Sequence, residues 1–156
     1  KNSDAWNPFY LAGYLNMDSS RAAQRDEFCA KIADNDKERV KAKFAELLTS
    51  KKFQISFADL FGMTDILYNK AGTQSDENWK ERIPADYIDK YYKNLSSAEP
   101  TAINVPEILK LALQAKIDMK VVKSSNPENT RKDLYEKYQP LLDELQTYAD
   151  ILKEPE

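Results

Sequence analysis

The chain has 156 residues, of which 42% are hydrophobic and 31% charged; this size and composition are typical of one globular domain and exclude a disordered segment. Its 23 basic and 26 acidic residues are interspersed without a block of five or more like charges, so we expect no nucleic-acid-binding surface. No apolar run approaches the roughly 20 residues of a membrane-spanning helix, and we expect no direct insertion into a membrane.

Apolar residues recur at three-four spacing along the chain and no comparable stretch alternates with period two, which predicts helices and no strands. The first expected helix covers 7–17, where Asn7 and Pro8 supply an N-cap and a first-turn proline. Because Lys and Arg are absent from it, an interfacial membrane helix is not favoured. We interpret it as a plug inside a bundle or as a strip that meets a partner. Apolar side chains surround it on almost every side: Phe9, Tyr10, Leu11, Tyr14, Leu15 and Met17.

A second helix is expected over 19–34, with the single cysteine of the chain, Cys29, on its apolar side. A thiol beside Phe28 and Ile32 is typical of inert core packing. Arg25, one turn earlier, leaves a reactive thiolate open as the alternative.

Two further helices follow, separated by a short extended link at 51–56. Asn35 or Asp36 caps the first of them, which ends near 49–50, and Gly72 ends the second, which begins at Phe57. Acids at Asp34, Asp36 and Glu38 have a spacing that resembles calcium ligands. When Asp34 is counted as the first position of a calcium-binding loop, the sixth position, which needs glycine, is Arg39. We therefore interpret these acids as a solvated capping cluster.

The next region contains the most prominent aromatic cluster. We expect one or two helical turns around Trp79, and then a fifth helix that Pro84 opens. Tyr87, Tyr91 and Tyr92 lie along this helix, and Tyr and Trp combine a large apolar area with a polar tip. Three interpretations remain open: a rim on the core of a small bundle, a docking face for a partner, or the lining of a small-molecule pocket.

The last two expected helices cover 105–122 and the segment from Pro127 onward. The first is apolar over a broad arc and is expected to be central, with neighbours on several sides. The second is expected to kink or break near 136–139 because of Pro140. It carries a seam that either packs within its own bundle or mediates self-association: Leu134, Tyr138, Leu141, Leu145, Tyr148 and Leu152.

The absence of histidine removes most familiar catalysis and metal chemistry. Without imidazole there is no Ser-His-Asp or Cys-His arrangement, no mixed thiolate-imidazole zinc site, no histidine-bound haem and no Glu-x-x-His di-iron site. The three glycines are widely separated and form no phosphate-binding loop. We therefore expect no metal, no cofactor and no catalytic residue, although two carboxylates alone can support glycoside hydrolysis.

These observations predict an all-α chain in which 1–156 form a single compact bundle of about six to eight helices. The predicted function is non-enzymatic: an assembly subunit or accessory protein that recognises another protein chain, by hetero- or self-association. A helical protein that holds a small ligand or pigment and a carboxylate-based hydrolase are the alternatives. The candidate partner-binding residues are all aromatic: Phe9, Tyr10, Tyr14, Trp79, Tyr87, Tyr91 and Tyr92.

Overall fold

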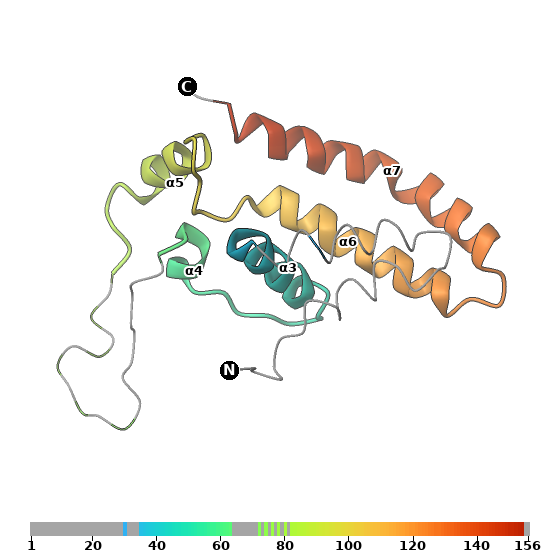
Figure 1. Ribbon diagram of the computed structural model, residues 1–156, viewed down its shortest axis with the longest axis horizontal. Helices are drawn as coiled ribbons and strands as arrows, with labels where there is room; N and C mark the ends of the chain where they lie inside the picture. The colour runs from blue at the N-terminus through green and yellow to red at the C-terminus, as the bar shows by residue number, and fades with distance from the viewer. Residues whose placement is uncertain are drawn as a thin grey trace. The chain divides into compact units, whose positions relative to one another are not determined.

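The structure is a computed structural model that describes Ala30, residues 35–63, residues 72, 74, 76, 78 and 80, and residues 82–154. Every regular element in these ranges is an α-helix (Figure 1), which confirms the all-α class. The expected helix over 7–17 falls outside the described residues, and so does the one over 19–34 except for Ala30, which is helical. Since five helices lie within the described ranges, the bundle of six to eight stays a prediction.

The described residues belong to two compact units, and each is considered by itself. The first unit contains the helices α3 (Asp36–Leu48), α6 (Val105–Val122) and α7 (Pro127–Ile151). The second contains α4 (Phe57–Phe61) and α5 (Tyr87–Leu95). The expectation of a single domain over 1–156 stays a prediction.

Helix α6 is the central element of the first unit. It packs against α3 and against α7, and Figure 1 shows it between these two helices. Its bounds are those expected from the sequence, and its broad apolar arc explains why it has neighbours on two sides. Small side chains on all three helices let the backbones approach closely. The buried apolar side chains of this unit are Ala42, Phe44, Ala45, Ile108, Ala112, Ala115, Ile117, Val121, Leu142 and Ala149.

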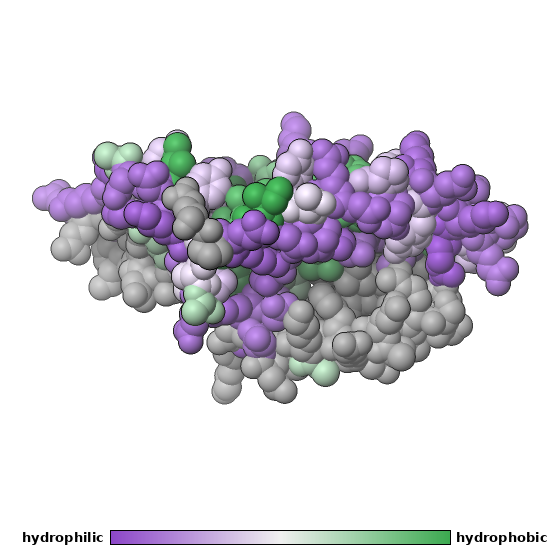
Figure 2. All heavy atoms as spheres, turned by 90° about the horizontal axis from the view of Figure 1, so that it is seen from above, coloured by the Kyte–Doolittle hydropathy of each residue, from purple (hydrophilic) through white to green (hydrophobic). Residues whose placement is uncertain are grey.

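The face of the molecule drawn in Figure 2 is mostly hydrophilic, and hydrophobic residues reach it only in separate places. This distribution agrees with the amphipathic pattern along α7, whose charged residues other than Arg131 are exposed.

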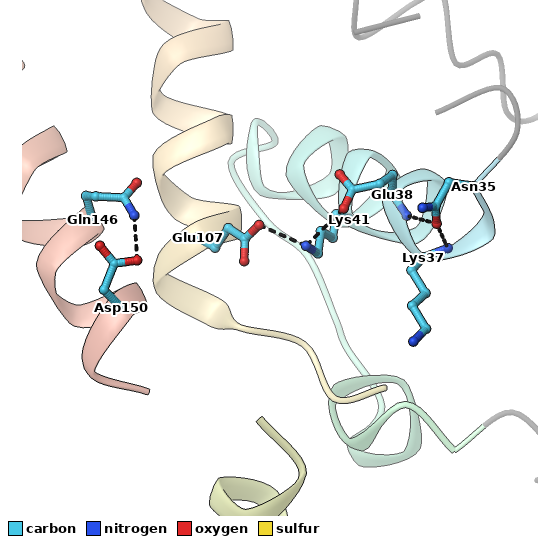
Figure 3. A network of polar contacts seen from close by, with 7 residues as sticks. All are labelled: Asn35, Lys37, Glu38, Lys41, Glu107, Gln146 and Asp150. Atoms are coloured by element: carbon cyan, nitrogen blue, oxygen red, sulfur yellow. Dashed lines mark hydrogen bonds and ion pairs between the residues drawn. The ribbon is translucent and has the colours of Figure 1, made fainter. Parts of the chain in front are cut away.

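Polar contacts join α6 to both of its neighbours. The ammonium of Lys41 on α3 lies 2.9 Å from Oε1 of Glu107 on α6 and 3.1 Å from Oε1 of Glu38 (Figure 3). Lys110, one turn after Glu107 on α6, contacts the other neighbour: its Nζ donates to Oε1 of Gln146 on α7 at 2.6 Å. Burial alone would lower the pKa of Lys41, but hydrogen bonds and charge attraction from Glu107 and Glu38 together outweigh it and raise that pKa.

The start of α3 is set by Asn35, as the sequence predicts. Its side-chain oxygen accepts hydrogen bonds from the backbone amides of Lys37 and Glu38 at 3.0 and 3.2 Å (Figure 3). These two amides have no partner inside the helix, so the cap satisfies donors that would otherwise bind only water.

Helix α7 runs through Pro140 without a break, and the carbonyl of Glu136 is left without the usual amide donor at position 140. A kink at this proline, the other expectation, stays a prediction. Of the expected seam, Leu134 and Tyr138 pack against the buried cluster that contains Leu142. Leu142 and Ala149 are buried whereas Leu141 and Tyr148 are exposed, so packing within the first unit does not hold for these two seam residues, and self-association through them stays a prediction.

The second unit departs further from the expected elements. Helix α4 ends at Phe61 instead of continuing to Gly72, because Gly62 adopts a left-handed conformation with φ of 66°; residues 64–71 fall outside the described part of the chain. Pro84 opens a turn, not the helix itself: the amide of Tyr87 donates to the Pro84 carbonyl at 3.2 Å, and α5 begins there.

Candidate functional site

Tyr91 is the anchor of the aromatic cluster in the second unit. Its ring meets the ring of Phe61, at the end of α4, edge to face with centroids 5.9 Å apart. Its hydroxyl donates a hydrogen bond of 2.6 Å to the carbonyl oxygen of Ile103. Tyr91 therefore links α5 both to α4 and to the segment that follows α5, and its polar tip is satisfied within the protein.

The segment 101–103 is fastened by its backbone on two sides. From α5, the side-chain oxygen of Asn94 accepts hydrogen bonds from the amides of Thr101 and Ala102 at 2.9 and 2.7 Å. The amide nitrogen of Asn94 also donates to the hydroxyl of Thr101 at 3.0 Å. From α4, the carbonyl of Leu60 accepts from the amide of Ile103 at 2.9 Å. The segment thus joins the two short helices, neither of which is long enough to be stable alone.

Gly62 allows the end of α4 to lie directly against this segment. A Cβ atom at this position would overlap the carbonyl oxygen of Thr101, and the left-handed backbone conformation is one that side chains other than glycine rarely adopt. Both observations explain why α4 ends here.

A pocket of about 260 Å³ opens to solvent between α4, the turn before α5, and α5 itself. Its walls are largely aromatic and apolar, and the polar groups of Asn94 and Thr101 at one end already bind each other. Lys90 also lines the pocket and lies 3.1 Å from Asp86, whose pKa is lowered by the hydrogen bond from this ammonium. The apolar side chains that line the pocket are Phe61, Met63, Pro84, Tyr87 and Tyr91.

Four exposed apolar side chains of the second unit, here named the aromatic rim, lie at the end of α4 and on α5: Met63, Tyr87, Ile88 and Tyr92. Met63 and Tyr87 face the same pocket, and Ile88 and Tyr92 are neighbours one turn apart on α5. The exposed fractions of Tyr87, Ile88 and Tyr92 are 41%, 51% and 45%. Three large apolar side chains thus remain accessible on a helix of nine residues.

The structure separates the sequence-predicted site residues into three groups. Tyr87 and Tyr92 lie at the exposed rim, whereas the half-buried Tyr91 supports the framework. Trp79 and the three N-terminal aromatic candidates fall outside the described residues, as does Cys29.

Sequence reasoning missed four residues that shape this region: Phe61, Met63, Asn94 and Thr101. Phe61 and Met63 flank Gly62, and a glycine directly after an apolar helical stretch is a C-cap signal that would have ended α4 correctly. Asn94 and Thr101 carry no such signal, because their roles depend on a contact between two residues seven positions apart, across the end of α5.

The arrangement can bind an apolar or aromatic group. Within the described ranges, no three His, Cys, Asp or Glu side chains gather closely enough to hold a metal ion. No helix in the described part of the chain is long and apolar enough to cross a membrane. Comparisons with protein-family models, curated proteins and solved structures found no match to this chain.

Proposed function

We propose that the protein works without catalysis, as a helical subunit or accessory protein that binds another protein chain through the aromatic rim. The observation that carries this proposal is the exposure of Tyr87, Ile88 and Tyr92 on a helix that Tyr91 and Asn94 hold in place. Binding to a preorganised surface loses less conformational entropy, and Tyr is among the residues that contribute most at protein interfaces.

The pocket beside the rim supports the same function. Its volume of about 260 Å³ is below the range of roughly 300–1,000 Å³ that small-molecule sites occupy, and it accommodates one large apolar side chain of a partner. The aromatic rings of Phe61 and Tyr87, with centroids 6.1 Å apart, provide walls for such an anchor. The alternative function is that the protein holds a small ligand or pigment in this pocket.

The carboxylate-based alternative has less support. A hydrolytic pair of acids needs one member with a raised pKa, which burial away from cations produces. Asp118 is buried, but no second acid is buried among the described residues. Glu38 and Glu107 both contact the Lys41 ammonium, so this pair of acids does not lie away from cations.

Site-specific crosslinking in the native source tests the proposal. In one variant of the chain, a photoreactive phenylalanine analogue replaces Tyr92. In a second variant, the same analogue replaces Lys132, an exposed residue of α7. We expect Tyr92, and not Lys132, to capture a defined protein that mass spectrometry identifies. Equal capture at both positions would contradict the proposal.

The captured protein is then purified and its binding measured by calorimetry. The double variant Tyr87→Ser/Tyr92→Ser should bind it at least about tenfold more weakly, because two interface aromatics are removed. The matched control is Phe53→Ser, since Phe53 is an exposed aromatic residue of the first unit. Unchanged affinity of the double variant, or an equal loss in the control, would overturn the assignment of the rim.

A further inference from the structure

The pocket between α4 and α5 is lined by three polar side chains that lie next to one another. Lys90 and Asn94 are four residues apart on α5 and therefore lie one turn apart on the same side of this helix. Asn94 in turn binds Thr101. The other side chains that line the pocket are apolar or aromatic, so an occupant of the pocket would contact both kinds of surface.

The three polar side chains have hydrogens left to donate. The Lys90 ammonium has three, of which Asp86 accepts one, and the Asn94 amide has two, of which Thr101 accepts one. Since the Thr101 hydroxyl is the acceptor in that bond, its own hydrogen has no acceptor among the described residues. The side-chain oxygen of Asn94, by contrast, already accepts from the amides of Thr101 and Ala102. These groups therefore favour a ligand group that accepts hydrogen bonds.

The charge at the pocket is positive. Of the described residues that line the pocket, Lys90 alone is charged at neutral pH. Its partner Asp86 does not line the pocket, and the side chains of both are more than half exposed, so this ion pair is weak and leaves the ammonium accessible to a second carboxylate. The pKa of Asp86 is lowered by the hydrogen bond from Lys90, and further by the charges of Lys90 and Lys93. Two cations thus act on one acid beside the pocket.

The acids within α4 and α5 point away from the pocket. At 100° per residue, Asp89 lies about 150° around α5 from the middle of the side that lines the pocket. Asp59 lies about 160° around α4 from Phe61, the residue of that helix that lines the pocket. Neither carboxylate opposes an anion in the pocket at short range.

The size of the pocket limits the occupant to about one large residue. Its volume is about 260 Å³, and the donors and the apolar side chains line this same volume. One residue must therefore supply both a large apolar group and an acceptor with negative charge. An internal apolar residue carries no charge, and Asp and Glu have no large apolar part. The last residue of a chain combines the two, because its α-carboxylate is attached beside its side chain.

Given that the protein binds a partner chain as proposed above, we infer that the pocket holds the C-terminal residue of that partner, and that this residue is large and apolar. Its side chain packs against Phe61 and Tyr87. Its α-carboxylate accepts charge-assisted hydrogen bonds from Lys90 and from the remaining hydrogens of Asn94 and Thr101.

The test uses the full chain and a fluorescein-labelled peptide, Ser-Gly-Ser-Gly-Phe, with a free C-terminal carboxylate. A second peptide ends in a carboxamide, and a third ends in Ala in place of Phe. Fluorescence anisotropy measures the three affinities. We expect the first peptide to bind at least about tenfold more tightly than either of the others, because each lacks one of the two groups that the pocket recognises.

Variants then locate the binding site. Lys90→Met keeps most of the side-chain stem but removes the ammonium, so it should weaken binding of the free-acid peptide at least about tenfold and abolish its advantage over the carboxamide. The matched control is Lys93→Met, since Lys93 is also exposed on α5 but does not line the pocket, and it should keep that advantage. Met63→Ser should weaken the free-acid and carboxamide peptides alike, because Met63 belongs to the apolar lining. Circular dichroism checks that the fold of each variant is unchanged.

Three results would overturn the assignment: equal or absent binding of the free-acid and carboxamide peptides, an equal loss in Lys90→Met and Lys93→Met, or displacement of the peptide by phenylacetate at the same concentration as by unlabelled peptide. The last result would assign the pocket to a small acid and not to a chain terminus.

The partner captured by crosslinking separates this inference from the proposed function. If Tyr87→Ser/Tyr92→Ser weakens that partner and Lys90→Met does not, the proposed function stands and the C-terminal residue is not what the pocket binds. If crosslinking captures no defined partner, the proposed function itself fails, whatever the peptides show.

Discussion

The hydroxyl of Tyr91 lies 2.6 Å from the carbonyl oxygen of Ile103, and this hydrogen bond joins α5 to a backbone position twelve residues further along the chain. The contact is partly buried, and the Tyr91 ring packs against Phe61 at the end of α4. One side chain therefore connects three segments of the second unit, and the exposed surface of α5 depends on it.

Removing that hydroxyl should destabilise the second unit. Tyr91→Phe keeps the ring contact with Phe61 but leaves the Ile103 carbonyl without this donor, so we expect the free energy of unfolding to fall by about 0.5–1.5 kcal/mol. Urea unfolding followed by circular dichroism measures the change. Tyr92→Phe is the control. Because Tyr92 is exposed, this substitution should change the free energy of unfolding by less than about 0.5 kcal/mol. Equal effects of the two substitutions would show that the hydrogen bond is not significant.

The two glycines with positive φ should respond differently to alanine. At Gly62, φ of 66° is combined with an overlap between the new Cβ and the Thr101 carbonyl, and we expect a loss of about 2 kcal/mol or more. At Gly72, φ is 78° but no atom lies within 4 Å, so only the backbone cost of about 1 kcal/mol remains. Urea midpoints compare the two variants. If Gly72→Ala costs as much as Gly62→Ala, the close approach of Gly62 to Thr101 plays no role.

The packing of α7 predicts a large difference between two adjacent leucines. Leu142 is 2% exposed and belongs to a cluster with Ile117 and Val121, so Leu142→Ala should cost about 2–5 kcal/mol through lost burial and a cavity. Leu141 points outward, and Leu141→Ala should cost no more than about 0.5 kcal/mol. Thermal and urea unfolding of both variants provide the measurement. A reversed order would show that α7 packs in the register that the sequence analysis expected.

The Lys41 ion pairs predict a stability term that disappears at high pH. The pKa of Lys41 in the folded protein lies above its ordinary value of 10.5. The protonated form is therefore favoured by folding, so the contribution is fully present below pH 10.5 and is lost as the pH rises through the folded-state pKa. Because the side chains are partly exposed, we expect Lys41→Met to lower the free energy of unfolding at neutral pH by only about 1 kcal/mol.

Urea unfolding from neutral pH to pH 11 should show the difference between Lys41→Met and the unaltered protein shrinking above pH 10.5. Lys37→Met is the control, because Lys37 is an exposed residue of the same helix whose backbone amide, not its ammonium, binds Asn35. If the loss of stability caused by Lys41→Met did not depend on pH, it would come from lost packing of the side-chain methylenes and not from the ion pairs.

Several features of the fold could be predicted because they depend on neighbours in the sequence. Asn35 caps α3 through amides two and three residues away, and the bounds of α6 follow from Pro106 in its first turn and from its apolar arc. The end of α4 was also readable in principle from Gly62, but the three-four spacing continues beyond it and led to a helix that was too long.

The candidate site was predicted only in part. The tyrosines of α5 were recognised as unusual, but Tyr91 could not be distinguished from Tyr87 and Tyr92 without knowing that Ile103 and Phe61 lie beside it. Met63 and Pro84 reach the same pocket from segments that are separated by twenty residues of chain, so no local pattern relates them.

The sequence by itself determined the helical class, the lack of imidazole chemistry and the start of most helices, since these depend on composition and on contacts within one or two turns. Tertiary structure alone decided which of two adjacent leucines on α7 is buried. Leu141 and Leu142 both fit three-four spacing but point about 100° apart around the helix axis, and only the position of α6 selects between them. The same selection leaves Leu141, Tyr148 and Ile151 exposed to solvent.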